Sequence, residues 1–231
     1  MQRWFCLPLI LGVALACTAA RGQEAALNPS LAAQYFREAR EVCARDAGHL
    51  WGASLCGPML FADPATRAAV ANQPDKENRL RSHGEVFVGT LPPETVIANT
   101  TTKWAGVKWT MVMWPPPEEK QARMQLLMHE SFHRVQDALK LAAANPANAH
   151  LDQKDGRIWL RLEWRALERA LQEQGAARRL AVTDALIFRR HRQALFPHAA
   201  AEESALETNE GLAEYTGLKL SARSSGELAA L

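Results

Sequence analysis

The stretch Met128-His129-Glu130-Ser131-Phe132-His133-Arg134-Val135-Gln136 contains the pattern His-Glu-x-x-His. On an α-helix, residues four apart lie on one face, so His129 and His133 can direct their imidazoles at a single metal ion. Glu130 follows the first histidine, where a carboxylate can take a proton from a water at the metal. The spacing therefore predicts a metal-binding helix with an adjacent general base.

Residues on both sides of this stretch favour the helix that the spacing requires. The prolines at 115–117 end the preceding segment, and Glu118 and Glu119 place negative charge in the first helical turn. Apolar side chains then recur every three or four residues. These residues are Met124, Leu127, Met128, Phe132, Val135 and Leu139. We therefore expect a helix over about 118–142.

A second acidic segment supplies a candidate third metal ligand. A catalytic zinc site has three protein ligands and keeps a fourth position for water. Glu210, within the stretch 208–215 (Thr-Asn-Glu-Gly-Leu-Ala-Glu-Tyr), is the carboxylate that we expect to complete the site. Glu207, Glu210 and Glu214 are spaced to share one helix face, where a nearby cation would relieve their repulsion. The alternative is a solvated acidic face without a ligand.

Further residues are candidates for supporting roles around these ligands. Glu214, one turn beyond Glu210, can accept the second ring N–H of a histidine that binds metal through its other nitrogen. Asp137, one turn beyond His133, is a second candidate for the same role. A donor that stabilises a developing oxyanion is sought among nearby N–H and O–H groups. The candidates are Tyr215, His191 and His198.

Composition indicates an ordinary globular protein. Apolar residues make up 48% of the 231 residues and charged residues 23%. The net charge is only +2, and basic residues are interspersed with acidic ones, so no nucleic-acid partner is expected. The length that remains after a targeting segment is enough for one domain with a core, and we assign residues 23–231 to it.

The first 22 residues have the pattern of a secretory signal peptide. A short positive start, residues 1–3, precedes the apolar run 4–17, and small residues follow it at 18–20. The run is too short to span a membrane comfortably, so no transmembrane segment is expected after cleavage within 19–22. Attachment of lipid at Cys17 is the alternative. Either way the chain is expected to be exported, to the periplasm or the medium.

Two cysteines, Cys43 and Cys56, remain after removal of the signal peptide. An isolated pair in an exported protein is typical of a disulfide. Two buried free thiols are the alternative.

The remaining sequence predicts an α+β fold. Short apolar runs at 58–62, 85–90, 96–102 and 107–114 predict strands of a small antiparallel or mixed sheet packed on the metal-site helix. Helical periodicity then predicts a mostly helical C-terminal half, with helices over about 157–174, 176–196 and 200–221. The polar segment 73–84 is expected to be a loop, and residues 65–72 are ambiguous.

Two segments of this fold carry alternatives. The strand at 107–114 is either a sheet edge, able to pair with an extended peptide, or a central strand. The segment Arg189-Arg190-His191-Arg192 could neutralise the acidic face at 207–214, bind a substrate carboxylate, or form a solvated basic face.

Together, His129-Glu130-x-x-His133 and Asn209-Glu210-Gly211-Leu212-Ala213-x-Tyr215 resemble the gluzincin group of zinc peptidases, exported bacterial members included. The resemblance implies that His129, His133 and Glu210 bind zinc and that Glu130 is the general base. It also implies a zincin-like sheet whose edge strand lies beside the active-site helix.

The resemblance covers only the segments 128–137 and 207–216. The spacing of 77 residues between His133 and Glu210 is far longer than in the large zinc aminopeptidases, and two helices fill it. The motif by which those enzymes recognise an N-terminus has no counterpart, so aminopeptidase specificity does not carry over. The resemblance therefore implies zinc-dependent cleavage of a peptide or protein substrate, with the substrate and the oligomeric state left open. The alternatives are a non-catalytic, zinc-stabilised binding module and a coincidental motif in a helical secreted protein.

Overall fold

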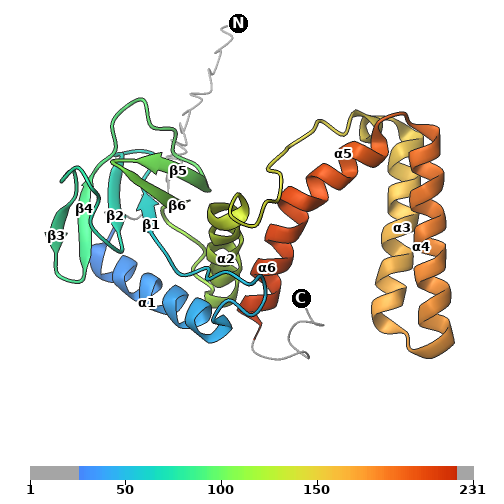
Figure 1. Cartoon of the computed structure of the whole chain (residues 1–231), viewed down its shortest axis with the longest axis horizontal. Coiled ribbons are helices and arrows are strands. Elements are labelled where there is room, and N and C mark those ends of the chain that lie inside the picture. Colours follow the sequence, from blue (N-terminus) through green and yellow to red (C-terminus); the bar gives the residue numbers. More distant parts are fainter. Residues whose placement is uncertain (1–25, 223–231) are drawn as a thin grey trace, which may run out of the picture.

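A six-stranded mixed sheet forms the N-terminal part of the fold (Figure 1). The computed structural model describes residues 26–222, and both the expected signal peptide and Cys17 lie outside them. The strand order is β3-β4-β2-β1-β6-β5. The strands are β1 (Met59–Ala62), β2 (Ala68–Ala71), β3 (Arg81–His83), β4 (Val86–Thr90), β5 (Thr100–Trp104) and β6 (Val107–Met113).

Strand β6 is a central strand, and β5 is the edge strand beside it. Strands β1 and β6 run parallel, whereas the other neighbours are antiparallel. The tight β5–β6 hairpin turns at Ala105 and Gly106, whose φ angles of 47° and 74° are those of a type I′ turn. The alternative that the strand at 107–114 forms the edge of the sheet is therefore wrong, because β5 pairs with the outer side of β6.

Strands β2 and β3 lie in segments where the sequence did not predict strands. Strand β2 is Ala-Ala-Val-Ala, which has little intrinsic strand preference, and its pairing with β1 and β4 determines its conformation. Strand β3 has three exposed residues and pairs only with β4. Both strands depend on tertiary pairing, which local propensity does not report.

Helices α1 (Pro29–Asp46) and α2 (Lys120–Gln136) pack on one face of the sheet. Phe36 of α1 stacks on Phe61 of β1 with ring centroids 4.7 Å apart, and Leu127 and Phe132 of α2 are fully buried. Burial of each such side chain contributes about 1.5–3 kcal/mol. This packing fixes α2 against the sheet.

Helix α2 ends earlier than its apolar pattern predicts. The Glu119 side chain caps the start of the helix by accepting hydrogen bonds from the backbone N–H groups of Gln121 and Ala122. At the other end, residues 137–140 form a turn, and Lys140 has a positive φ of 59°. Leu139 still packs against the core from this turn, which explains why the apolar pattern continues beyond the helix.

The structure joins Cys43 at the end of α1 to Cys56 in a disulfide, with Cα atoms 5.3 Å apart. This is the pairing expected from the sequence. The bond closes a short loop that leads from α1 into β1.

Replacing both cysteines with serine is expected to lower the free energy of unfolding by about 3 kcal/mol, because the unfolded chain regains the entropy of the open loop. Urea denaturation of the variant and of the oxidised wild type measures the difference. Reduced wild-type protein should match the variant. Equal stability of all three would contradict the prediction.

The C-terminal half is helical. Helices α3 (Lys154–Gln172) and α4 (Gly175–Leu195) form an antiparallel hairpin that stands to one side of the sheet (Figure 1). The short helix η1 (Ala149–Asp152) leads into the hairpin. Helix α5 (Ala199–Leu206), the π-helical turn η2 (Glu207–Gly211) and helix α6 (Leu212–Ser221) follow it. Within residues 26–222, no helix is both long and apolar enough to cross a membrane.

A buried cluster of charged side chains joins α3 and α4 to each other and to α5. Arg192 of α4, only 1% exposed, pairs with Glu163 of α3 at 2.7 Å and with Glu203 of α5 at 2.6 Å. Arg189 pairs with Glu163 and also with Glu207 of η2. Of the alternatives for the arginine-rich segment, the structure shows neutralisation of Glu207 alone, because no arginine of this segment pairs with Glu210 or Glu214 among residues 26–222.

Candidate metal centre

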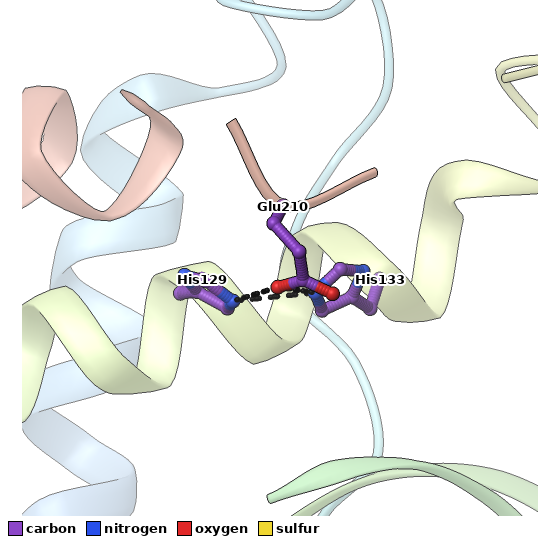
Figure 2. Close-up of side chains that lie close together, drawn as sticks. All are labelled: His129, His133 and Glu210. Carbon is purple, nitrogen blue, oxygen red and sulfur yellow. Dashed lines mark hydrogen bonds and ion pairs between the residues drawn. The ribbon is translucent and has the colours of Figure 1, made fainter. Parts of the chain in front are cut away.

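Three potential ligand atoms converge where α2 meets η2 (Figure 2). The Nε2 atoms of His129 and His133 lie 3.2 Å apart. Oε2 of Glu210 lies 3.4 Å from Nε2 of His129 and 3.6 Å from Nε2 of His133. Glu210 lies 81 and 77 residues after His129 and His133 in the sequence, and the packing of α6 on α2 brings it to them. Such convergence is not expected of a coincidental motif.

The donor set and its spacing fit zinc. Two imidazole nitrogens and one carboxylate oxygen are a known ligand set of catalytic zinc sites. Bonds of about 2.0–2.1 Å in a tetrahedron place ligand atoms about 3.4 Å apart. The three separations of 3.2, 3.4 and 3.6 Å match this value without rearrangement of the backbone.

A π-helical turn places Glu210. The sequence predicts one regular helix over 200–221, but the structure widens it at η2, between α5 and α6. In this turn Glu207 faces Arg189 of the hairpin while Glu210 faces the histidines. The expectation that Glu207 shares the face of Glu210 and Glu214 is therefore wrong. Single π-turns inside α-helices are frequent at functional sites.

Close packing of α6 on α2 sets the distance between the ligands. A Cβ atom on Gly217 of α6 would lie 2.5 Å from the backbone oxygen of Gln125 on α2. A larger residue would therefore push the two helices apart. Thr216, which is fully buried beside this glycine, accepts a hydrogen bond from Nε1 of Trp51 at 2.9 Å.

Glu214 lies where the sequence predicts a partner for a ligand histidine. Its Oε2 is 3.2 Å from Nδ1 of His129, and its Oε1 accepts a hydrogen bond from Gln125. A proton on Nδ1 of His129 leaves the lone pair of Nε2 free for a metal. Glu214 therefore orients His129.

Gln136, which the sequence reasoning missed, is the partner of the second histidine. Its Oε1 lies 2.9 Å from Nδ1 of His133, and its Nε2 donates to Oδ1 of Asn209 at 3.1 Å. Asn209 in turn donates to Oε1 of Glu210 at 2.9 Å. This chain of hydrogen bonds links two candidate ligands, His133 and Glu210, through buried amides. Its only sequence signal is a Gln three residues after His133, one helical turn away.

Asp137 does not have the role that the sequence suggested. Its carboxylate is exposed and accepts a hydrogen bond at 2.9 Å from Nζ of Lys108 on β6. This ion pair lowers the pKa of Asp137. The expectation that Asp137 orients His133 is wrong, because Gln136 already occupies that ring nitrogen.

Glu130 lies beside the three ligand atoms and is not one of them. It is 5% exposed, and its Oε2 has no hydrogen-bond partner among the described residues. Burial, with a smaller contribution from the Glu210 carboxylate, raises the pKa of Glu130 to about 7. Its carboxylate can therefore exchange a proton near neutral pH.

An open cavity of about 450 Å³ exposes the site. His129, Glu130, His133 and Glu210 line one side of it. The other side comes from β5, the polar loop after α2, and Lys108. The residues there include Asn99, Thr100, Thr101, Lys108, Ala143 and Asn145. A metal held by the three ligands would therefore face a space that a substrate can enter.

None of the expected oxyanion donors lines this cavity. Tyr215 is 46% exposed on α6, and His191 packs on Trp159 in the hairpin, with ring centroids 4.1 Å apart. His198 is the exposed residue before α5. The side chains with donor groups that do line the cavity include Lys108 and Asn145. The sequence could not indicate either, since strand pairing and a loop bring them there.

Comparisons of the chain with protein-family models, curated proteins and solved structures found no match. The class of site therefore has to be inferred from its own residues and geometry.

Replacing Glu214 or Gln136 with alanine is expected to weaken zinc binding by about 10–100-fold, the usual cost of removing a partner of a ligand histidine. Competition with a chromophoric chelator measures the affinity. Asp137→Ala is the matched control, since it removes a carboxylate next to Gln136 that touches neither histidine. An equal loss in all three variants would contradict these assignments.

Proposed function

We propose that this protein is a zinc-dependent peptidase of gluzincin type. The convergence of His129, His133 and Glu210 on tetrahedral ligand spacing carries the proposal. When bound, zinc would lower the pKa of a coordinated water to about 7 and polarise a substrate carbonyl.

Glu130 is the general base in this proposal. Its carboxylate takes a proton from the attacking water and passes it to the leaving amine. The position of Glu130 supports this role, because the residue lines the same cavity as the three ligands. It is not among the three residues whose ligand atoms converge.

The open edge of β5 is the proposed binding site for the substrate backbone. Next to a type I′ turn, the flanking residues Trp104 and Val107 form a backbone hydrogen-bonded pair. Along the rest of the antiparallel ladder, hydrogen-bonded pairs alternate with pairs that share no hydrogen bond. Thr101 and Lys103 therefore direct their backbone N–H and C=O groups to the open edge. Thr101 also lines the cavity at the metal site, so an extended peptide paired here would pass the ligands.

A non-catalytic, zinc-stabilised binding module is the second candidate. A structural zinc site is closed by four protein ligands. Among residues 26–222, only three candidate ligands come together, and their ligand atoms face a cavity. This arrangement favours the peptidase.

The test begins with the metal content of the purified protein and cleavage of a peptide library. One equivalent of zinc, and cleavage that stops with a chelator and returns with zinc, would support the peptidase. Stoichiometric zinc without cleavage would favour the binding module. Absence of stoichiometric zinc would contradict both candidates.

A further inference from the structure

Exposed apolar side chains are concentrated on the α3–α4 hairpin. Nine of the twelve large hydrophobic residues that are exposed within 26–222 lie on these two helices, so this is a local feature of the hairpin. The most exposed are Leu171 at 79%, Trp164 and Leu180 at 60%, and Ile187 at 56%.

Five of these residues form one face, which we call the hairpin face. On α3, Trp164, Leu167 and Leu171 follow a spacing of three and four residues and therefore share one side. On α4, Val182 and Leu186 are one turn apart.

Side-chain contacts show that the two rows lie on the same side of the hairpin. Glu163 of α3 pairs with Arg189 of α4, so these two residues mark one flank. Leu167 lies one turn after Glu163, and Leu186 lies one turn before Arg189. The other flank is marked by Trp159, which packs on Phe188 and His191. Because the helices are antiparallel, the two apolar rows run side by side.

Three arginines and one acidic residue, Glu168 of α3, border the hairpin face. By helical spacing, Arg161 lies at its outer edge on α3, and Arg179 and Arg190 lie at its outer edge on α4. All three are exposed, and none has an ion-pair partner among residues 26–222. The two helices together carry ten Lys or Arg residues and four Asp or Glu residues, so the border is positively charged.

We propose that the hairpin face binds an acidic amphipathic helix of another protein. The apolar side of that helix would pack across α3 and α4 and complete a three-helix bundle. Its carboxylates would pair with Arg161, Arg179 and Arg190. This interaction is independent of the metal site and of the proposed peptidase activity.

The backbone of the hairpin favours a helix over an extended segment. The N–H and C=O groups within α3 and α4 are used in their own helices, so no edge is available for strand addition. Binding therefore relies on side chains, as in the docking of an amphipathic helix in a groove. Charge argues against a second copy of the chain, because two hairpins would bring like charges together.

The test uses the full mature chain and two labelled peptides. Each is an amphipathic helix of about 18 residues, long enough to cover the face, with leucines on one side. One peptide has glutamates on its polar side, and its twin has lysines at the same positions. Fluorescence anisotropy should show at least about tenfold tighter binding of the acidic peptide, with a strong dependence on salt.

Two sets of variants separate the apolar and charged contributions. Leu171→Asp with Leu186→Asp should abolish binding of the acidic peptide, whereas Ile187→Asp on the opposite flank should not. The triple variant Arg161→Glu, Arg179→Glu, Arg190→Glu keeps every apolar residue and should reverse the preference, so that the lysine peptide binds more tightly. Circular dichroism confirms that each variant is folded.

Several outcomes would overturn the proposal. One is equal binding of both peptides, and another is a triple variant whose preference is unchanged. A wild-type dimer in sedimentation experiments that dissociates on Leu171→Asp would assign the face to a second copy. Binding of anionic lipid vesicles without binding of the acidic peptide would assign it to a membrane surface.

Discussion

The variant Glu130→Gln is expected to retain one equivalent of zinc and to lose peptide hydrolysis by about 10²–10⁴-fold, the usual contribution of a general base. Glutamine keeps the shape of the side chain but does not accept the proton of the attacking water. Zinc should remain because Glu130 is not among the three converging ligands. Folding should be retained as well, since Oε2 of Glu130 makes no hydrogen bond within the described residues that the substitution would remove.

Cleavage of a quenched fluorescent peptide, identified from the library, measures the loss, and elemental analysis measures zinc. The control is Glu118→Gln, which makes the same chemical change at an exposed position just before α2. It should match the wild type in both measurements. If Glu130→Gln retained both zinc and full activity, Glu130 would not be the base and the mechanism would be wrong.

The local part of the site could be predicted from the sequence because helical geometry fixes it. His129 and His133 are one turn apart on any regular helix, and the apolar pattern predicts which helix carries them. Glu210 needed a second motif, since its approach depends on the packing of α6 against α2. Gly217, which permits that packing, has no local signal of its importance in the sequence.

The partners of the ligand histidines show where sequence reasoning reaches its limit. Gln136 and Asp137 are three and four residues after His133, and both positions can reach it from a regular helix. The choice between them depends on tertiary contacts, because Lys108 of β6 pairs with Asp137 while Asn209 and the backbone oxygen of Ala142 satisfy the Gln136 amide. Strand pairing similarly determines which strand forms the edge of the sheet. Periodicity left the strand at 107–114 as either an edge or a central strand, and the pairing places β5 at the edge.

The helical half shows the same division between periodicity and tertiary structure. The 3.6-residue pattern predicts α3 and α4 with nearly correct bounds. It does not predict that the hairpin stands apart from the sheet, with α2 and α6 between them (Figure 1). Nor does it predict that an apolar face of the hairpin is exposed. The π-turn η2 also has no periodic signal, because one extra residue in a turn leaves the flanking patterns intact.

The variant Glu210→Ala is expected to weaken zinc binding by roughly 10²–10³-fold. Structural zinc sites with four ligands bind with about 10–16 kcal/mol, which is about 2.5–4 kcal/mol for each ligand. Chelator competition measures the affinity, and hydrolysis should fall with zinc occupancy. Added zinc should restore part of the activity, because the base Glu130 is still present.

Glu207→Ala is the matched control, since this carboxylate lies in the same π-turn but pairs with Arg189 of the hairpin. Its loss should lower stability and leave zinc affinity unchanged. If both variants lost zinc equally, the π-turn as a whole would be the determinant, and Glu210 would not be a ligand. If neither lost zinc, the two histidines alone would hold the metal. Loss of zinc affinity in Glu210→Ala, with unchanged affinity in Glu207→Ala, would therefore show that Glu210 acts as a metal ligand and not as one member of an acidic helix face.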